Sequence, residues 1–339
     1  MPSDSVLRGV GRPGPDSGLI CGFALRADGS GRTIETHDVA ACLADEGAVI
    51  WLHFNGAHAG ARRWLAQSGI VPTSFLRLIE EHDDRVQVAA TPAGVIAAID
   101  DLAFGETVDP SEIVTLWVYA SERLLVTARN HASMTADRLR QSARTGVAAS
   151  GGFWLLARLL DAQVHLLRQW LQVASHQLDH AEDRILIGQV AEQRESLGRI
   201  RRQAMHLRRH FAPLRLAVDR LPTLLVGKEG AGDAERWRLV HDELGYSVDE
   251  AAAVYERAKL LQEELASRLA EATNRNLYVL TTWTIVFLPM TLISGIFGMN
   301  VDGVPGAGDR ATAGPFWLVM LLMLLAGALV FLLLRRRGR

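Results

Sequence analysis

The feature that most restricts the fold is an uncharged run of 21 residues, from Leu277 to Phe297. A helix rises about 1.5 Å per residue, so this run measures about 31 Å and matches the hydrocarbon core of a bilayer. A second apolar run of 19 residues extends from Phe316 to Leu334. The two runs predict transmembrane helices at 275–300 and 316–334, with a connecting loop at 301–315.

Charges beside these runs predict how the two helices are oriented. Arg268 and Arg275 precede the first run, and a basic tail at 335–339 follows the second. The loop carries only two acidic residues and one arginine. By the positive-inside rule both chain ends lie in the cytoplasm and the loop lies outside. We therefore expect a multi-pass membrane protein, with the lipid bilayer as a partner.

Composition and short motifs exclude several classes of protein. The formal net charge of −2 gives no basic excess to neutralise phosphates, so we expect no nucleic acid partner. The only cysteines, Cys21 and Cys42, form no CxxC motif, which argues against a zinc ribbon and a disulfide framework. Residues 1–18 are rich in Gly, Pro and Ser without an apolar core, which predicts a flexible leader rather than a signal peptide. We find no P-loop, GxSxG, HExxH or GxGxxG motif in a matching context, so we expect neither an enzyme nor a cofactor.

Residues 19–130 alternate short apolar runs with turn residues, which is typical of a cytosolic α/β sheet domain. Ser121, Glu122 and Arg123 predict the tip of a hairpin. The expected strands are 19–25, 48–54, 86–90, 94–100, 113–120 and 124–128, and the expected helices are 61–68 and 73–82.

The pattern changes at about residue 131 to long helices, so residues 131–274 are expected to form a helix bundle and a stalk. Apolar residues repeat every three and four positions from Leu156 to Leu171. Helices are expected at about 152–187 and 191–218, and from about 233 through the first membrane run. Pro222 is expected to mark the turn before the last helix. The fold class is therefore α+β.

The order of these parts, with Gly298-Met299-Asn300 at the outer end of the first span, resembles the CorA metal-ion transporter family. The tripeptide is preceded by PMT at 289–291 and by GIF at 295–297. The segment GMNVDGVP is similar to the pattern of the ZntB-like zinc transporter branch, and WLHFNGAHAGARRWL resembles the N-terminal domain of that branch. The resemblance covers nearly all of residues 19–339.

The resemblance implies a funnel-shaped homopentamer in the bacterial inner (plasma) membrane, in which the first span of each subunit lines one central pore. It assigns the selectivity filter to Gly298, Met299 and Asn300. It implies a divalent metal ion as cargo, with zinc expected and cadmium, nickel or cobalt as related substrates, and uptake coupled to the proton gradient. The pore-lining positions that follow by alignment are Asn274, Leu277, Leu280 or Thr281, Thr284, Leu288 and Thr291.

Spacing and chemistry agree with this assignment. Positions 274, 277, 281, 284, 288, 291 and 295 fall on one helical stripe. A hairpin of two helices cannot enclose a polar pathway, so conduction requires several copies. Carboxamide oxygens of Asn300 can accept hydrogen bonds from water on a divalent cation, and neutral dipoles bind weakly enough for its release. The threonines offer hydroxyl groups, and the leucines form apolar constrictions.

Several residues near this pathway allow more than one interpretation. Threonines in membrane helices also bond to their own helix. Pro289 either bends the span or serves as a gating hinge. Asp302 at the pore mouth either gathers cations as a carboxylate ring or is a solvated loop charge. Asp302 also departs from the pattern of both branches, which leaves the preferred ion open.

Two histidine pairs lie outside the membrane runs. His176 and His180 lie four residues apart on a predicted helix, and so do His206 and His210. Each pair either binds a regulatory metal ion from one helix face or belongs to a solvated, charged face. The arginine-rich segment 194–215 either binds an anion or forms ion pairs with neighbouring helices or subunits.

Two other functions compete with zinc transport. One is a magnesium or cobalt channel of the CorA type, whose cytosolic domain senses magnesium. The other is a membrane-tethered scaffold or sensor that conducts nothing. Metal flux into liposomes separates the first from zinc transport, and substitution of Asn300 separates the second.

Overall fold

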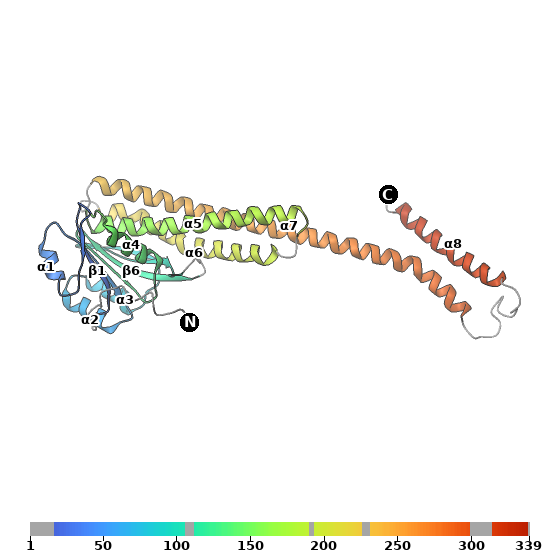
Figure 1. Cartoon of the computed structure of the whole chain (residues 1–339), viewed down its shortest axis with the longest axis horizontal. Coiled ribbons are helices and arrows are strands. Elements are labelled where there is room, and N and C mark those ends of the chain that lie inside the picture. The colour runs from blue at the N-terminus through green and yellow to red at the C-terminus, as the bar shows by residue number, and fades with distance from the viewer. Residues whose placement is uncertain (1–16, 106–111, 190–192, 226–230, 299–313, 338–339) are drawn as a thin grey trace. The chain divides into compact units, whose positions relative to one another are not determined.

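The computed structural model describes residues 17–105, 112–189, 193–225, 231–298 and 314–337 (Figure 1). The chain divides into two compact units, one ending at Gln262 and the other beginning at Glu263. The division falls inside α7, a helix of 67 residues from Ala231 to Phe297. The first unit holds the sheet, the helices that precede α7 and the beginning of α7, and the second holds the end of α7 with α8 (Gly314–Arg337).

The first unit is built on one seven-stranded sheet with the order β2-β1-β3-β7-β6-β5-β4. All neighbouring strands are antiparallel except β3 and β7, which are parallel. The predicted hairpin tip is confirmed, because Ala120 of β6 pairs with Leu125 of β7. The strands are β1 (Leu19–Leu25), β2 (Gly31–Thr33), β3 (Val49–Asn55), β4 (Gln87–Thr91), β5 (Gly94–Leu102), β6 (Ile113–Ser121) and β7 (Leu124–Arg129).

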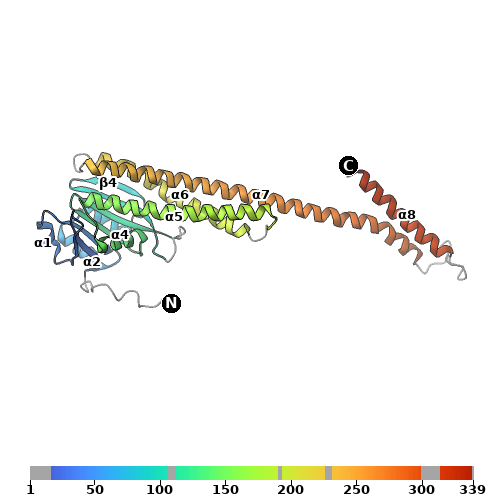
Figure 2. The same ribbon diagram turned by 45° about the horizontal axis from the view of Figure 1, so that its top comes forward.

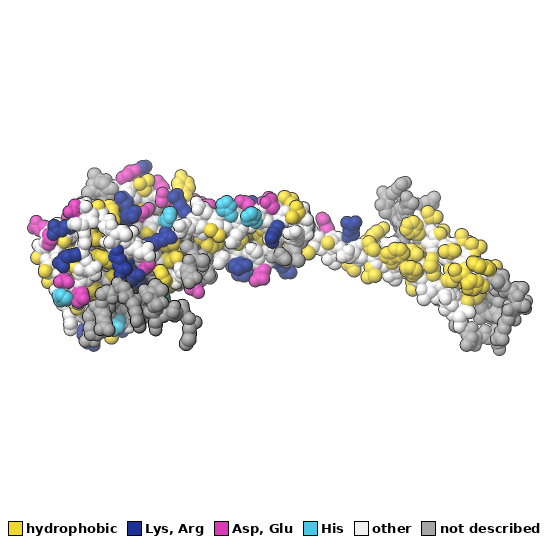
Figure 3. Space-filling model, viewed as in Figure 1, with side chains coloured by type: hydrophobic (Ala, Val, Ile, Leu, Met, Phe, Trp, Pro, Cys, Tyr) yellow, Lys and Arg dark blue, Asp and Glu magenta, His cyan; other side chains and the backbone are white. Residues whose placement is uncertain are grey.

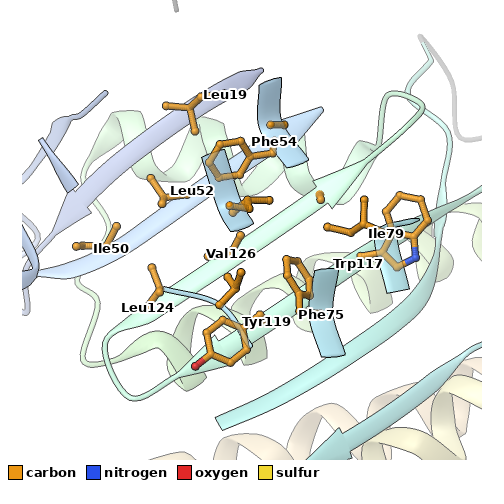
Figure 4. Close-up of a cluster of buried hydrophobic side chains, with 14 of the residues drawn as sticks. Leu19, Ile50, Leu52, Phe54, Phe75, Ile79, Trp117, Tyr119, Leu124 and Val126 are labelled. Carbon is orange, nitrogen blue, oxygen red and sulfur yellow. The ribbon is translucent and has the colours of Figure 1, made fainter. Parts of the chain in front are cut away.

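One face of the sheet packs against short helices and forms a hydrophobic core (Figure 4). Ile50, Leu52 and Phe54 of β3 alternate toward this face, as side chains on a strand do. The ring of Phe75 lies 6.2 Å from that of Tyr119 on β6, which ties a helix to the sheet. The short helices are α1 (Val39–Ala44), α2 (Ala59–Ser68) and α3 (Thr73–Glu80).

Longer helices complete the first unit: α4 (Met134–Thr145), α5 (Gly152–Leu186) and α6 (Gln193–Leu224). Figures 1 and 2 show α5, α6 and α7 side by side. Arg257 of α7 joins the helices through ion pairs with Asp179 at 2.7 Å and Glu182 at 2.6 Å on α5. The carbonyl oxygen of Asp100 on β5 accepts a hydrogen bond from the side chain of Gln163, which ties α5 to the sheet.

The expected turn at Pro222 is wrong, because α6 continues through Pro213 and Pro222 to Leu224. Proline removes one backbone hydrogen bond, but a buried helix face can offset that loss. Val218 and Leu221 are almost completely buried here, so packing holds the last turns in the helix.

Asp101 of β5 is fully buried, and four donors converge on its carboxylate. The backbone N–H groups of Leu102 and Thr135 donate at 2.8 and 3.2 Å, and the hydroxyls of Ser133 and Thr135 donate as well. Burial raises the pKa of Asp101 above the ordinary aspartate value, and these hydrogen bonds offset only part of that rise. Ser133 also accepts from the N–H of Ala136 at 3.1 Å, so Asp101 orients the residue that caps α4.

A second buried polar group, His53 of β3, is held as a neutral imidazole. Arg129 donates to Nε2 of His53 at 2.8 Å, so the ring proton lies on Nδ1 and faces the Thr127 hydroxyl oxygen at 2.7 Å. The same oxygen accepts a hydrogen bond from the indole N–H of Trp51 at 3.0 Å. The Thr127 hydroxyl in turn donates to the carbonyl oxygen of Leu52, with 3.4 Å between the two oxygens. Burial, reinforced by the charge of Arg129, lowers the pKa of His53 to about 3.

We expect the folded chain to lose stability as the pH falls below the ordinary histidine pKa of 6.5. The unfolded chain then binds a proton that folded His53 does not, so the free energy of unfolding falls by about 1.4 kcal/mol per pH unit until about pH 3. Thermal unfolding in detergent at pH 7 and pH 5 measures this loss. His53→Gln should reduce the difference in thermal stability between pH 7 and pH 5, whereas the exposed control His37→Gln should not. An equal effect of both variants would contradict the assignment of this pH dependence to His53.

Candidate ion pathway

The second unit exposes large apolar side chains (Figure 3). Leu277 is 53% exposed and Leu288 is 66% exposed. Among the described residues, one helix, within α7, is long and apolar enough to cross a membrane, and the apolar segment Phe316–Leu332 of α8 (Gly314–Arg337) is shorter. The length and composition of α7 thus fit the first predicted span, whereas the second span stays a prediction.

The predicted pore-lining residues all lie on α7 and all are exposed in the single chain. Side chains three and four positions apart on a helix share a face, so the stripe is present on one copy, with Leu280 at its edge. One exposed face does not enclose a pathway, and a pore wall requires further copies. These residues are Asn274, Leu277, Leu280, Thr281, Thr284, Leu288 and Thr291.

The threonine hydroxyls on this stripe are oriented by the helix itself. Thr284 donates to the carbonyl oxygen of Leu280 at 2.9 Å, and Thr291 donates to that of Phe287 at 2.9 Å. Each hydroxyl proton is therefore used within α7, and the oxygen keeps a lone pair that can accept a hydrogen bond. Bonding to the own helix and facing a hydrated cation are thus compatible roles for these threonines.

A shallow hollow on α7 is lined by Leu288, Thr291, Leu292, Gly295 and Ile296. Apart from its chain neighbours and the adjacent helix backbone, no atom of the described residues lies within 4 Å of the place where a Cβ of Gly295 would stand. The helix surface is therefore open beside Thr291, and its lining is apolar apart from that hydroxyl group.

Of the predicted filter, the structure describes Gly298 alone. Its N–H donates to the carbonyl oxygen of Ser294 at 2.9 Å and closes the last turn of α7. A Cβ at this position would lie 3.1 Å from the same oxygen, so a side chain would crowd the turn. Met299, Asn300 and Asp302 lie outside the described residues, so the filter and pore-mouth roles stay predictions.

A contact between α7 and α8 was not anticipated from the sequence. A Cβ at Gly327 would come within 2.0 Å of the terminal methyl carbon of Met290, so α8 approaches α7 closely there. Small residues allow such approach between membrane helices. The available signal was a single glycine inside the second apolar run.

The histidine pairs differ in their surroundings. Nδ1 of His210 lies 2.6 Å from a carboxylate oxygen of Asp100 on β5, and its ring centroid lies 4.5 Å from that of His206. His176 and His180 are exposed on α5. Among the described side chains, no group of three or more His, Cys, Asp or Glu residues is arranged to hold a metal ion. Metal binding by either pair therefore stays a prediction.

Comparison with known proteins assigns the family. A family model described as "CorA-like Mg2+ transporter protein" matches residues 46–336. The chain belongs to this family. The resemblance noted in the sequence is thereby confirmed, and the protein is a divalent cation transporter of the CorA family rather than an enzyme.

Individual relatives agree with the family. This CorA-family chain is 28% identical over 309 residues to the zinc transport protein ZntB of Enterobacter sp. (strain 638), covering 90% of this chain and 92% of the relative. The structure of the full-length CmaX protein matches with a TM-score of 0.79 at 24% identity, covering 96% of this chain and 99% of CmaX. The structure of the CorA magnesium transporter from Methanocaldococcus jannaschii matches with a TM-score of 0.74 at 19% identity, covering 94% of this chain and 98% of that transporter. These likenesses show the CorA-like α+β fold of sheet domain and long helices.

Proposed function

We propose that this CorA-family chain carries zinc across the bacterial inner membrane through a pore that five copies form around α7. The observation that carries the proposal is the exposed stripe of threonine and leucine on a helix of membrane length. The choice of zinc rests on the zinc transport relative and on the GMNVDGVP segment. Cadmium, nickel and cobalt are related substrates.

In this proposal each part of the stripe has its own role. Asn300 holds the hydrated cation at the outer mouth through carboxamide oxygens, while Gly298 and Met299 shape the end of the helix. Thr291 and Thr284 accept hydrogen bonds from the water of the passing ion. The leucines of the stripe form constrictions that close by excluding water.

A magnesium channel is the second candidate, and it is favoured by the family description and by the magnesium transporter with the same fold. Both candidates use the same pathway, so only the ion separates them. No formal charge lies between Leu277 and Phe297, so proton coupling would depend on titrating groups outside this run.

We expect purified protein in liposomes to take up zinc, and an inward proton gradient to increase the rate. A fluorescent zinc indicator inside the vesicles measures the flux, and a magnesium indicator in parallel vesicles measures the competing ion. Magnesium flux without zinc flux would contradict the zinc proposal. An equal rate of zinc uptake with and without the gradient would contradict the prediction of proton coupling.

A further inference from the structure

In the first unit, α7 leaves one face uncovered. Tyr246 is 71% exposed, Leu260 is 62% exposed and Leu239 is 52% exposed. These positions are separated by seven and fourteen residues, and the exposed Ala253 occupies the remaining position of the repeat. The opposite side of the same helix is buried within the chain, at Trp237, Leu244, Ala251, Val254 and Ala258.

A repeat of seven residues is typical of a helix face that packs along another helix. Single exposed apolar residues need no explanation, but three large ones in register on one helix indicate a surface that is covered in the assembled protein. The helices α5 and α6 of the same chain lie against the buried side, so they do not cover this face.

Acidic residues flank the face. Asp242 and Glu250 lie four residues before and after Tyr246, and both are exposed. Neither forms a direct ion pair within the part of the chain that the structure describes, although the charge of Asp242 helps to raise the pKa of Arg238 on the same helix. Asp249, beside Glu250, reaches Arg215 of α6 at 3.5 Å. A partner of this face should therefore bring basic side chains.

Such a surface is present on the same chain. Arg199, Arg202, Arg208 and Arg209 of α6 are exposed, and none of them forms an ion pair with a described residue. Met205, which is 47% exposed, lies among them and offers an apolar side chain to a partner. Charge and apolar character are thus complementary between the α7 face and the arginine face of α6.

We propose that the α7 face, defined by Leu239, Tyr246 and Leu260, docks on the arginine face of α6 of a second copy of this chain. Two different surfaces in contact form a heterologous interface, and repetition around an axis closes a ring. The inference rests on the proposed function in one respect, since a pathway around α7 requires several copies. It adds which cytosolic surfaces hold the copies together.

Photo-cross-linking of the full chain in detergent tests the interface. A benzoylphenylalanine at position 246 or 260 should give dimers and larger species on a denaturing gel, with cross-linked peptides from residues 199–209. The same probe at Val173 of α5, which is 54% exposed, is the matched control and should give little cross-linked product. Cross-links absent at 246 and 260, or confined to other surfaces, would overturn the interface.

Charge exchange provides a second arm. Arg202→Glu with Arg209→Glu should reduce cross-linking from position 246 several-fold, and Asp242→Arg with Glu250→Arg in the same chain should restore it. No reduction in the first variant would also overturn the interface. Zinc flux is measured separately on the wild-type protein, so cross-linking without flux would contradict the proposed function and leave the interface intact.

Discussion

Asn300→Ala is expected to abolish metal transport while the protein still assembles. The proposed pore mouth contains five copies of this residue, and the substitution removes five acceptors for the water of the cation. At about 1 kcal/mol for each lost hydrogen bond, the ring loses about 5 kcal/mol, so the zinc flux should fall to about one-thousandth or less. Zinc uptake by proteoliposomes at matched protein density measures the loss.

The control for this variant is an asparagine of α7. Asn276 is exposed on α7 but does not belong to the stripe that contains Asn274 and Leu277. Asn276→Ala should keep most of the flux, which separates loss of the acceptor from general damage to the helix. A scaffold that conducts nothing predicts no change in cellular zinc for either variant, so unchanged accumulation in Asn300→Ala would exclude the pore.

Local patterns predicted much of the fold because their causes are local. The strand from Leu19 to Leu25 and the start of α5 at Gly152 were predicted at their observed positions, since apolar periodicity and glycine punctuation mark them directly. The short elements α1 and β2 were missed. β2 has three exposed residues and α1 has only six residues, so neither carries enough periodic signal.

Contacts between distant residues could not be predicted in the same way. His210 and Asp100 are separated by 110 positions, and no pattern around either residue indicates the other. The stripe on α7 was predictable because it depends on the spacing within one helix. The close approach of Gly327 to Met290 depends on how two helices pack, so the sequence supplies only a small residue and no partner.

Asp101→Ala is expected to be the most damaging substitution in the sheet domain. The carboxylate satisfies two backbone N–H groups and two hydroxyl groups in a site without solvent access. Its removal leaves buried donors without an acceptor, and each such donor costs about 1–3 kcal/mol. The hydroxyls can turn toward other acceptors, so we expect a net loss of about 3–5 kcal/mol in the free energy of unfolding.

The effect should propagate to α4, because Asp101 orients Ser133, the residue that caps that helix. Thermal unfolding in detergent should show a decrease in Tm of about 10 °C. Asp101→Asn keeps the size and one acceptor oxygen but directs an NH2 group at donors, so its loss should be intermediate. Asp28→Ala is the matched control, since exposed Asp28 accepts two hydrogen bonds from Ser30 in a surface turn, where water can replace the lost acceptor, and its loss should cost far less stability than the loss of Asp101. Equal destabilisation by Asp28→Ala and Asp101→Ala would show that burial of the carboxylate is not what makes Asp101 important.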